Sequence, residues 1–200
     1  SPQMQNAGLN HIHYNGIYEK HHLEDGSKIK ETFLRNGYSG ANITVPHKEV
    51  AFINADIVKG LAQKIKAVNT YKLVDGKIEA YNTDAPGFLK AIESFGEVKN
   101  VLLLGAGGTA KAIAIALQEK NIKVTVLNRS ENNLKFFIEN NIQAHTWAEF
   151  EPEIYDLVVN STSAGLKDEL LPAPKELLEP ILKNASFAFD CIYRSEEHTS

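Results

Sequence analysis

Lys48 is the residue whose type and setting first suggest chemistry, in the stretch NITVPHKE over residues 42–49. Residues 43–45 are apolar or β-branched, as at the end of a strand, and Pro46 suits the first position of a helix because its missing N–H costs nothing there. Lys48 is therefore expected in the first turn of a helix. An amine fixed in this way is a candidate proton donor and acceptor. The alternative is an ordinary, solvated surface lysine.

A second chemical signature is the glycine-rich turn in LLLGAGGTAKA. Gly105, Gly107 and Ala110 have the GxGxxA spacing of dinucleotide-binding folds, and Ala106 and Gly108 complete the turn. The first glycine makes the tight turn, the second lets the backbone approach a pyrophosphate, and the alanine keeps helix and strand close. Backbone N–H groups at the helix N-terminus would hold the pyrophosphate. Such turns also serve plain strand-to-helix packing, but an apolar strand precedes this one and an amphipathic helix follows.

The residues after the next strand bear on which dinucleotide would bind. An NAD-binding domain usually carries Asp or Glu about 20 residues after the glycines, where it accepts from the ribose 2′-OH. This chain has VLNRS there, and Arg129 could pair bidentately with a 2′-phosphate. The missing acid also removes the repulsion that a phosphate would feel. We therefore expect NADP rather than NAD, unless Arg129 is only an arginine where a helix starts.

The composition favours a small-molecule partner over a macromolecular one. The chain has 200 residues, 43% of them hydrophobic, which suffices for one sizeable core or two small ones. A net charge of -4 argues against a nucleic-acid surface or an anionic membrane surface. No apolar segment approaches the roughly 20 residues that cross a bilayer. With one cysteine, hence no internal disulfide, and no visible signal peptide, we expect a cytoplasmic protein.

The hydrophobic periodicity predicts a first, mixed α/β unit up to about Tyr81. A hairpin is expected across Asp75 and Gly76, which are typical of a two-residue β-turn. The other strands are expected at residues 11–18 and 40–45, and helical turns at residues 27–37, 48–54 and 60–66.

From Pro86 the pattern alternates between helix and strand, which predicts a second unit. Helices are expected at residues 86–96, 133–141 and 176–184, and another directly after the glycine turn. Strands are expected before the glycine turn, after its helix, and at residues 155–162 and 186–193. Such alternation is typical of a parallel sheet with helices on both faces. The predicted fold class is therefore α/β, with an N-terminal mixed-sheet domain at residues 1–95 and a C-terminal Rossmann-type, doubly wound parallel sheet at residues 96–193.

Both ends of the sequence look cut. The chain opens on SPQMQNAGL without a methionine and closes on RSEEHTS, residues 194–200, which has no apolar periodicity. That heptapeptide is what the start of a common short-read sequencing adapter encodes when it is translated. We therefore expect residues 194–200 to be an artefact and the biological chain to be truncated after Tyr193.

Six motifs occur in one chain in a fixed order: NITVPHKE, AVNT, NTDAPGF, GAGGTAKA, NRS and NSTSAGL. Together they resemble the shikimate dehydrogenase family, over residues 1 to about 193. The resemblance implies hydride transfer between NADP and the pair 3-dehydroshikimate and shikimate, in the biosynthesis of chorismate and aromatic amino acids. It also implies a substrate domain and a Rossmann domain that flank the active cleft.

The resemblance assigns Lys48 as the catalytic lysine and Asp84 as its partner. A donor is needed because the ketone oxygen gains negative charge when hydride arrives, and a lysine beside a carboxylate can supply the proton. The carboxylate would orient the ammonium and hold substrate hydroxyls. Read without the resemblance, NTDAPG could be only a helix start, with Thr83 or Asp84 as its cap before Pro86.

The remaining site residues follow from the same resemblance. Asn69 and Thr44 would hydrogen-bond the substrate, although an Asn in a turn and a Thr in a strand are also ordinary. Ser1 would match the second serine of a Ser-x-Ser-Pro motif, and Tyr193 would lie near the substrate. The cofactor-binding set is Gly105, Ala106, Gly107, Gly108, Ala110, Asn128, Arg129, Ser130, Thr162 and Ser163.

Three departures from the family pattern limit these expectations. The family often has a second basic residue four positions after the clamp arginine, where this chain has Asn133, so selectivity for NADP could be weaker unless Lys135 substitutes. The first strand of the substrate domain is missing, which exposes backbone groups that should be paired. The C-terminal helices, with a glutamine that binds substrate, are missing too.

Two rival functions stay open at this point. One is a quinate or quinate/shikimate dehydrogenase that uses NAD, and the other is a catalytically silent module that binds a nucleotide. No metal is expected, although His11, His13, His21 and His22 lie close together, because no Cys or acidic cluster accompanies them. The protein is expected to be a monomer or a homodimer.

Overall fold

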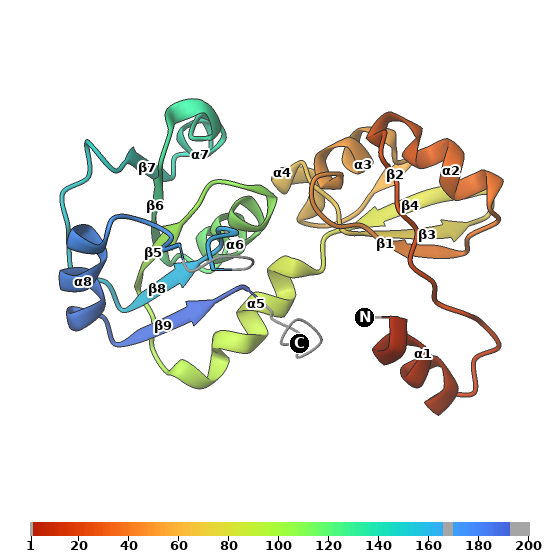
Figure 1. Cartoon of the computed structure of the whole chain (residues 1–200), viewed down its shortest axis with the longest axis horizontal. Helices are drawn as coiled ribbons and strands as arrows, with labels where there is room; N and C mark the ends of the chain where they lie inside the picture. The colour runs from red at the N-terminus through yellow and green to blue at the C-terminus, as the bar shows by residue number, and fades with distance from the viewer. Residues whose placement is uncertain (1, 166–169, 193–200) are drawn as a thin grey trace.

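Two β-sheets organise the chain, whose computed structural model describes residues 2–165 and 170–192 (Figure 1). The first sheet has the strand order β1-β3-β4-β2, and the second has the order β7-β6-β5-β8-β9. Figure 1 shows the sheets in separate lobes, with α5 (Asp84–Ile92) leading from one to the other. The predicted α/β class is confirmed.

The first sheet is mixed, as predicted. Its strands are β1 (Gly40–Asn42), β2 (Ile57–Val58), β3 (Thr70–Val74) and β4 (Lys77–Tyr81). Strand β2 runs parallel to β4, and the other pairs are antiparallel. Asp75 and Gly76 both have positive φ, 49° and 75°, which the two-residue turn between right-twisted strands requires. The predicted hairpin is therefore confirmed.

Helices cover one face of this sheet. They are α2 (Ile29–Arg35), which a 3-10 turn η1 (Gly26–Lys28) precedes, α3 (Lys48–Asn54) and α4 (Ala62–Ile65). Phe33 from α2 and Ala51 from α3 pack with Tyr71 and Ile78 of the hairpin in one buried cluster. The helices that were predicted around residues 27–37 and 48–54 are present, and Gly37 follows α2 with φ 67°.

The segment before α2 differs from its prediction. Residues 2–11 form a helix, α1 (Pro2–His11), with no buried side chain, and a turn and irregular backbone follow it. The strand predicted at residues 11–18 is therefore wrong. The side chain of Asn6 donates to the carbonyl of Tyr18 at 2.8 Å and accepts from its N–H at 2.7 Å. Because a side chain satisfies these backbone groups, Tyr18 needs no neighbouring strand to pair them.

The start of α3 also corrects a prediction. Strand β1 ends at Asn42, and the cis bond between Val45 and Pro46 lies in a turn over residues 45–47. The N–H of His47 donates to the carbonyl of Thr44, which closes this turn before the helix begins at Lys48. Pro46 is therefore not the first helical residue, but Lys48 does lie in the first turn.

A groove of about 920 Å³ runs along the outer edge of β1. Segment 17–24 forms one wall, β1 and the following loop form another, and Ile29 and Phe33 of α2 contribute apolar surface. Within residues 2–165 and 170–192, no strand pairs with this edge of β1.

The second sheet is entirely parallel. Its strands are β5 (Asn100–Leu104), β6 (Lys123–Asn128), β7 (Gln143–Thr146), β8 (Leu157–Asn160) and β9 (Phe187–Asp190). The chain order reverses between β5 and β8, so this is the doubly wound arrangement, and ligands bind such sheets at the reversal. The short strand β7 was missed because QAHT lacks a run of apolar or β-branched residues.

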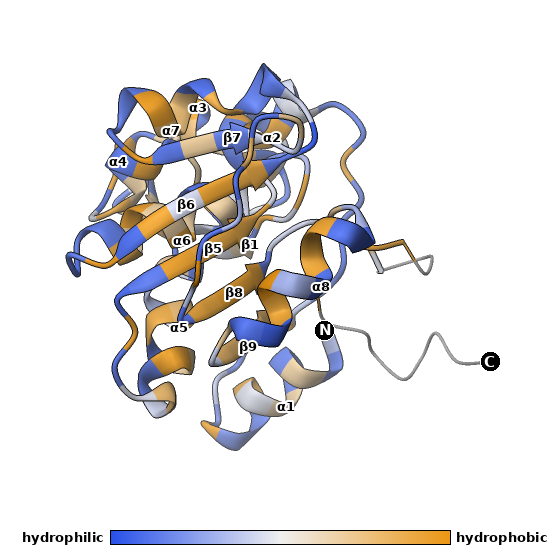
Figure 2. Cartoon of the chain, turned by 90° about the vertical axis from the view of Figure 1, so that its left-hand side faces the viewer, coloured by the Kyte–Doolittle hydropathy of each residue, from blue (hydrophilic) through white to orange (hydrophobic). Residues whose placement is uncertain are grey.

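Helices cover both faces of this sheet, as predicted. On one face lie α5, α6 (Gly108–Gln118) and α7 (Lys135–Glu139), and on the other lies α8 (Lys175–Asn184). Figure 2 shows the apolar strands β5, β6 and β8 enclosed between them. Phe88 and Ile92 of α5 are buried in the same cluster as the apolar face of α6. The boundary at residue 95 stays a prediction, and α5 supplies side chains to the core of the second sheet.

No helix in the described part of the chain is both long enough and apolar enough to cross a lipid bilayer.

Asp56 gives a pH-dependent test of how α2 is fixed to the first sheet. Its carboxylate accepts from the N–H of Ile78 at 2.8 Å and pairs with Lys30 of α2, and these contacts, in that order, lower its pKa below 3.8. Folding therefore stabilises the ionised form, and this contribution is present above pH 3.8 and lost as the pH falls through the lowered pKa. We expect Asp56→Asn to be less stable than the parent at pH 7.

Urea unfolding at several pH values measures this effect. The difference between the parent and Asp56→Asn should shrink as the pH falls below 3.8 and vanish once the pH is below both the ordinary and the lowered pKa of Asp56. Replacement of the exposed Glu24 by Gln is the control and should leave the free energy of unfolding unchanged at every pH tested. A difference that persists in acid would contradict the electrostatic origin.

Candidate active site

Lys48 and Asp84 form an ion pair between two helix starts. Lys48 opens α3 and Asp84 opens α5, and the distance from Nζ to Oδ2 is 2.7 Å. The carbonyl of Lys48 accepts from the N–H of Val68, which ties the start of α3 to the residues before β3. The side chains are 13% and 29% exposed, so the pair is shielded but open to solvent on one side. The structure brings together the two residues that the sequence proposed as a catalytic pair.

Asn69 holds the second oxygen of the same carboxylate. Its Nδ2 donates to Oδ1 of Asp84 at 2.8 Å and to Oγ1 of Thr83 at 2.9 Å, and its Oδ1 accepts from the N–H of Thr83. Asn69 directly precedes β3, and Thr83 follows β4 by two residues. Because β3 and β4 form an antiparallel hairpin, the start of one lies beside the end of the other, which brings these residues together.

Asn82 is a positioning residue that the sequence reasoning missed. Its Oδ1 accepts from the N–H groups of Asp84 and Ala85, at 3.1 and 3.3 Å, and its Nδ2 donates to the carbonyl of Ala67. It therefore caps α5 and fixes the backbone of Asp84. Thr83 does stand at the N-cap position of α5, but its side chain makes no cap bond, and the helix begins at Asp84, before Pro86. The signal was available, because Asn is a favoured capping residue.

The glycine turn between β5 and α6 has the geometry that its sequence predicted. Gly105 has φ 101°, and a Cβ there would lie 2.9 Å from Cγ2 of Thr162. Gly107 precedes the first residue of α6, and a Cβ there would meet nothing within 4 Å. Ala106 and Ala110 are buried at the base of the turn. Gly105 is therefore required by the protein itself, whereas Gly107 leaves open space at a helix N-terminus, as the approach of a pyrophosphate requires.

Thr162 and Ser163 follow β8, which is the neighbour of β5 at the point where the strand order reverses. Thr162 bonds through its N–H and its Oγ1 to Oδ1 of Asn160, at 3.0 and 2.8 Å, and Ser163 is exposed. The contact with Gly105 places Thr162 against the glycine turn, so both elements line the same end of the parallel sheet.

The three candidate phosphate-clamp residues lie at the end of β6 and after it. Nδ2 of Asn128 donates to the carbonyl of Ser130 at 2.8 Å, and this bond shapes the turn around Arg129. Arg129 is exposed and has no ion pair within the described residues. Its guanidinium is therefore available to an added phosphate. Lys135, the possible second base, pairs with Glu139 at 3.7 Å on the surface.

The two halves of the site meet at Gly108 and Lys48. A Cβ on Gly108, the first residue of α6, would lie 3.8 Å from Cδ of Lys48, which is ordinary contact distance. The ammonium of Lys48 therefore sits beside a turn shaped for a dinucleotide. Such an arrangement can pair a proton donor with a hydride-transfer cofactor.

Other candidates lie at the margin of the site or outside it. Thr44 is exposed and lines the groove along β1, in the loop that leads to Lys48. Ser1 and Tyr193 fall outside the described residues. Cys191 follows β9, and burial, with smaller effects from Asp190 and Asp84, raises the pKa of its thiol to about 11, so it is not an activated nucleophile. Within residues 2–165 and 170–192, no group of three or more His, Cys, Asp or Glu side chains could hold a metal ion.

Comparison with known families gives two adjacent matches. A sequence model described as the shikimate dehydrogenase substrate binding domain matches residues 1–71, and one described as shikimate / quinate 5-dehydrogenase matches residues 90–173. Among curated proteins, the shikimate dehydrogenase (NADP(+)) of Helicobacter hepaticus is 44% identical over 195 residues, which are 96% of this chain and 72% of that protein. The enzyme of the same name from Helicobacter pylori is 40% identical over 197 residues, 96% of this chain and 73% of that protein.

Solved structures agree with these matches. The shikimate 5-dehydrogenase of Thermus thermophilus, crystallised in complex with NADP(H) and shikimate, superposes with a TM-score of 0.78 at 34% identity, over 96% of this chain and 74% of that one. Shikimate dehydrogenase 1 of Peptoclostridium difficile gives a TM-score of 0.83 at 26% identity, over 96% and 73%. Each similarity extends over nearly the whole chain and so includes both sheets.

The glycine turn offers a matched pair of substitutions. Gly105→Ala should destabilise the fold by about 2–4 kcal/mol, because a positive φ strains any L side chain and the added methyl meets Thr162. Gly107→Ala should change stability by less than about 1 kcal/mol, because its Cβ would point into open space. Denaturant unfolding distinguishes the two. Equal effects would contradict the described geometry of the turn.

Proposed function

The chain belongs to the shikimate dehydrogenase family, and on that premise we propose that it catalyses the reversible, NADPH-dependent reduction of 3-dehydroshikimate to shikimate. This reaction is a step in the biosynthesis of chorismate and the aromatic amino acids. The observation that carries the proposal is the Lys48–Asp84 pair beside the glycine turn. The ion pair supplies a proton donor and the glycine turn supplies a dinucleotide site. Together they are the minimum that reduction of a ketone by hydride requires.

Lys48 is the proposed proton donor. NADPH, when bound, supplies the hydride to the ketone carbon. Negative charge then develops on the ketone oxygen, and Nζ of Lys48 donates its proton to that oxygen. In the oxidative direction the amine accepts the proton of the same hydroxyl. Oδ2 of Asp84 orients the ammonium, and Asn69 prevents the carboxylate from rotating by holding Oδ1.

The residues of the second sheet fit the cofactor. The open space at Gly107, the N-terminus of α6 and the exposed guanidinium of Arg129 suit a pyrophosphate and a 2′-phosphate. The residues proposed to hold the dinucleotide are Gly105, Ala106, Gly107, Gly108, Ala110, Asn128, Arg129, Ser130, Thr162 and Ser163.

The first sheet supplies the proposed substrate contacts. Asn69 lies in the hydrogen-bond network of Asp84, and Thr44 lines the adjacent groove. Ser1 and Tyr193 remain predictions from the family resemblance. In this proposal residues 1–95 form the substrate domain and residues 96–193 the NADP domain, and the protein acts in the cytoplasm as a monomer or homodimer.

Replacement of Lys48 tests the proposed chemistry. With protein expressed from the complete coding sequence, shikimate should support reduction of NADP⁺, followed at the nicotinamide absorbance. Lys48→Met keeps the apolar stem beside Gly108 but removes the proton, so kcat should fall about 10²- to 10⁴-fold. Affinity for NADP⁺, measured by fluorescence titration, should stay within about twofold, since the substitution leaves the glycine turn intact.

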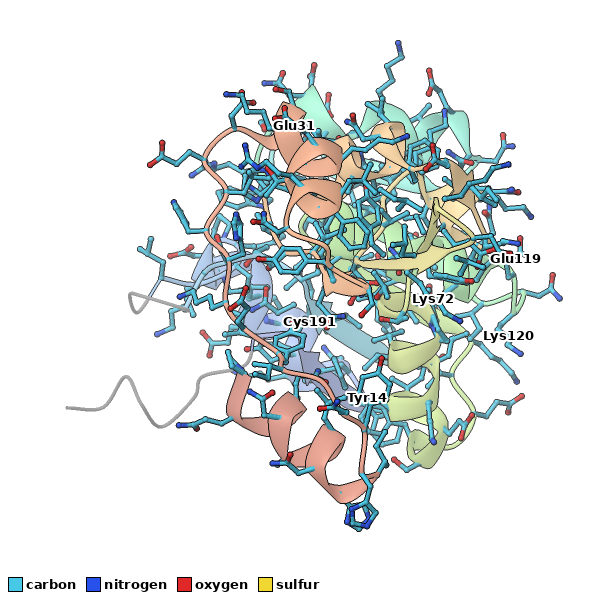
Figure 3. The ribbon with its side chains drawn as sticks, turned by 90° about the vertical axis from the view of Figure 1, so that its right-hand side faces the viewer. Tyr14, Glu31, Lys72, Glu119, Lys120 and Cys191 are labelled. Carbon is cyan, nitrogen blue, oxygen red and sulfur yellow. The ribbon has the colours of Figure 1, made fainter. Side chains whose placement is uncertain are left out.

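Lys72→Met is the matched control, because Lys72 is an exposed lysine on β3, in the sheet that α3 covers (Figure 3). It should retain the parent's kcat. NADP⁺ binding without turnover in the parent would favour a silent nucleotide-binding module. Full activity of Lys48→Met would leave the family assignment in place and contradict the role of Lys48.

Arg129 tests cofactor selectivity separately. Arg129→Gln should lower kcat/KM for NADP⁺ about 10- to 100-fold, because charged hydrogen bonds to the 2′-phosphate are lost, and should leave the value for NAD⁺ unchanged. Lys135→Gln is the control for a nearby surface cation and should have a smaller effect, since Lys135 pairs with Glu139. Equal turnover with both dinucleotides, and a preference for quinate, would favour the quinate/shikimate alternative.

A further inference from the structure

Two ion pairs join α6 and Glu119, the residue that follows it, to helices of the first sheet, and the two pairs differ in solvent exposure. Nζ of Lys111 lies 2.5 Å from Oε1 of Glu49 on α3, and Nζ of Lys64 on α4 lies 2.5 Å from Oε1 of Glu119. The Lys111 side chain is only 16% exposed, whereas that of Lys64 is 60% exposed. Figure 3 shows Glu119 at the periphery of the molecule. In the first pair the lysine is therefore shielded and the carboxylate, 55% exposed, stays open to solvent, whereas in the second pair both side chains are largely open to solvent.

Lys111 is held on more than one side. It lies in the first turn of α6, where its N–H donates to the carbonyl of Gly107. Its ammonium stands 5.1 Å from the centre of the Phe136 ring on α7, a cation–π contact. A cation that is partly desolvated between a carboxylate and a ring has few alternative positions. Lys111 therefore gives Glu49 a fixed partner on the second sheet's side.

The residues next to this pair are those of the proposed reaction. Glu49 directly follows Lys48 in the first turn of α3. Lys111 follows Gly108 by three residues, and a Cβ on Gly108 would lie 3.8 Å from Cδ of Lys48. The ion pair thus links the helical turn that carries the proton donor to the helical turn that would carry the cofactor's pyrophosphate.

The main packing contacts between the two lobes lie elsewhere. Helices α4 and α5 pack against α6, while α3 meets α6 through the side chains of Glu49 and Lys48. We propose that Lys111 is a positioning residue, which acts through Glu49 to set the distance between Nζ of Lys48 and the glycine turn. This inference rests on the proposed function.

The physical consequence falls on the chemical step. Proton and hydride must reach adjacent atoms of one carbonyl, and a misplacement of about 1 Å can cost about 100-fold in rate. Lys111 uses its ammonium on Glu49 and Phe136, so its loss should leave the binding of either ligand largely unchanged. We therefore expect Lys111→Met to lower kcat about tenfold and to change KM for shikimate less than about twofold.

A set of variants of the full-length protein tests the coupling. Glu49→Gln should reproduce the effect of Lys111→Met, and the double variant should be no worse than either single one, because all three lack the same contact. Lys111→Arg retains the cation and should retain most of the activity. Lys64→Met removes the surface pair between α4 and Glu119, the residue after α6, and should leave kcat unchanged.

Three further measurements distinguish positioning from general destabilisation. Deuterium at the reacting carbon of shikimate should slow Lys111→Met more than the parent, because hydride transfer then limits turnover. Titration calorimetry of Lys111→Met with shikimate, in the absence of cofactor, should give the same affinity as the parent. A water-soluble carbodiimide should join Glu49 to Lys111 as an amide, with the lost oxygen leaving on the urea, and peptide mapping should find this link in the parent and not in Glu49→Gln.

The outcomes separate this inference from the proposed function. A parent that does not oxidise shikimate would overturn the proposed function itself. An active parent with an equally active Lys111→Met would overturn only the positioning role. A defect in Lys111→Met without one in Glu49→Gln, or an added loss in the double variant, would show that Lys111 acts by another contact and would also overturn the proposal. Melting curves identify a variant that fails to fold, and Lys111→Arg and Glu49→Gln then decide the question.

Discussion

The carboxylate of Asp84 is the constraint on which the candidate site depends. One oxygen accepts from Lys48 at 2.7 Å and the other from Asn69 at 2.8 Å, so a single side chain joins the starts of α3, β3 and α5. Because both oxygens are engaged, the carboxylate cannot rotate without losing a hydrogen bond, and the ammonium of Lys48 inherits this fixed direction. Asn82 adds the backbone half of the constraint by capping the helix that Asp84 begins.

The same residue couples the site to the second sheet. Asp84 begins α5, and about one and two helical turns further along, Phe88 and Ile92 are buried with the apolar side of α6. Packing in the core of the second, parallel sheet therefore sets the direction of the Asp84 carboxylate. Its partners, Lys48 and Asn69, belong to the lobe of the first, mixed sheet. A site built in this way needs both sheets, and neither half of the chain contains it alone.

This shared construction bears on the rival functions. A module that only bound a nucleotide would need the glycine turn and the residues after β6, all of which lie in the second sheet's half. It would have no use for a shielded lysine paired with a carboxylate that an amide in turn fixes, beside the first residue of α6. The quinate alternative is different, because the same catalytic residues would serve it, and the exposed Arg129 is the residue proposed to select between the two dinucleotides.

The sequence by itself determined the features that depend on near neighbours: the alternation of helix and strand in the second half, the Asp75–Gly76 hairpin, and the glycine turn with its positive φ at Gly105. These follow from local sterics and hydrophobic periodicity. Only the tertiary structure decided that residues 11–18 form no strand, that Pro46 stands outside α3, and that Lys111 reaches Glu49. A strand needs a partner and an ion pair needs an approach between distant segments, and neither is written in the order of adjacent residues.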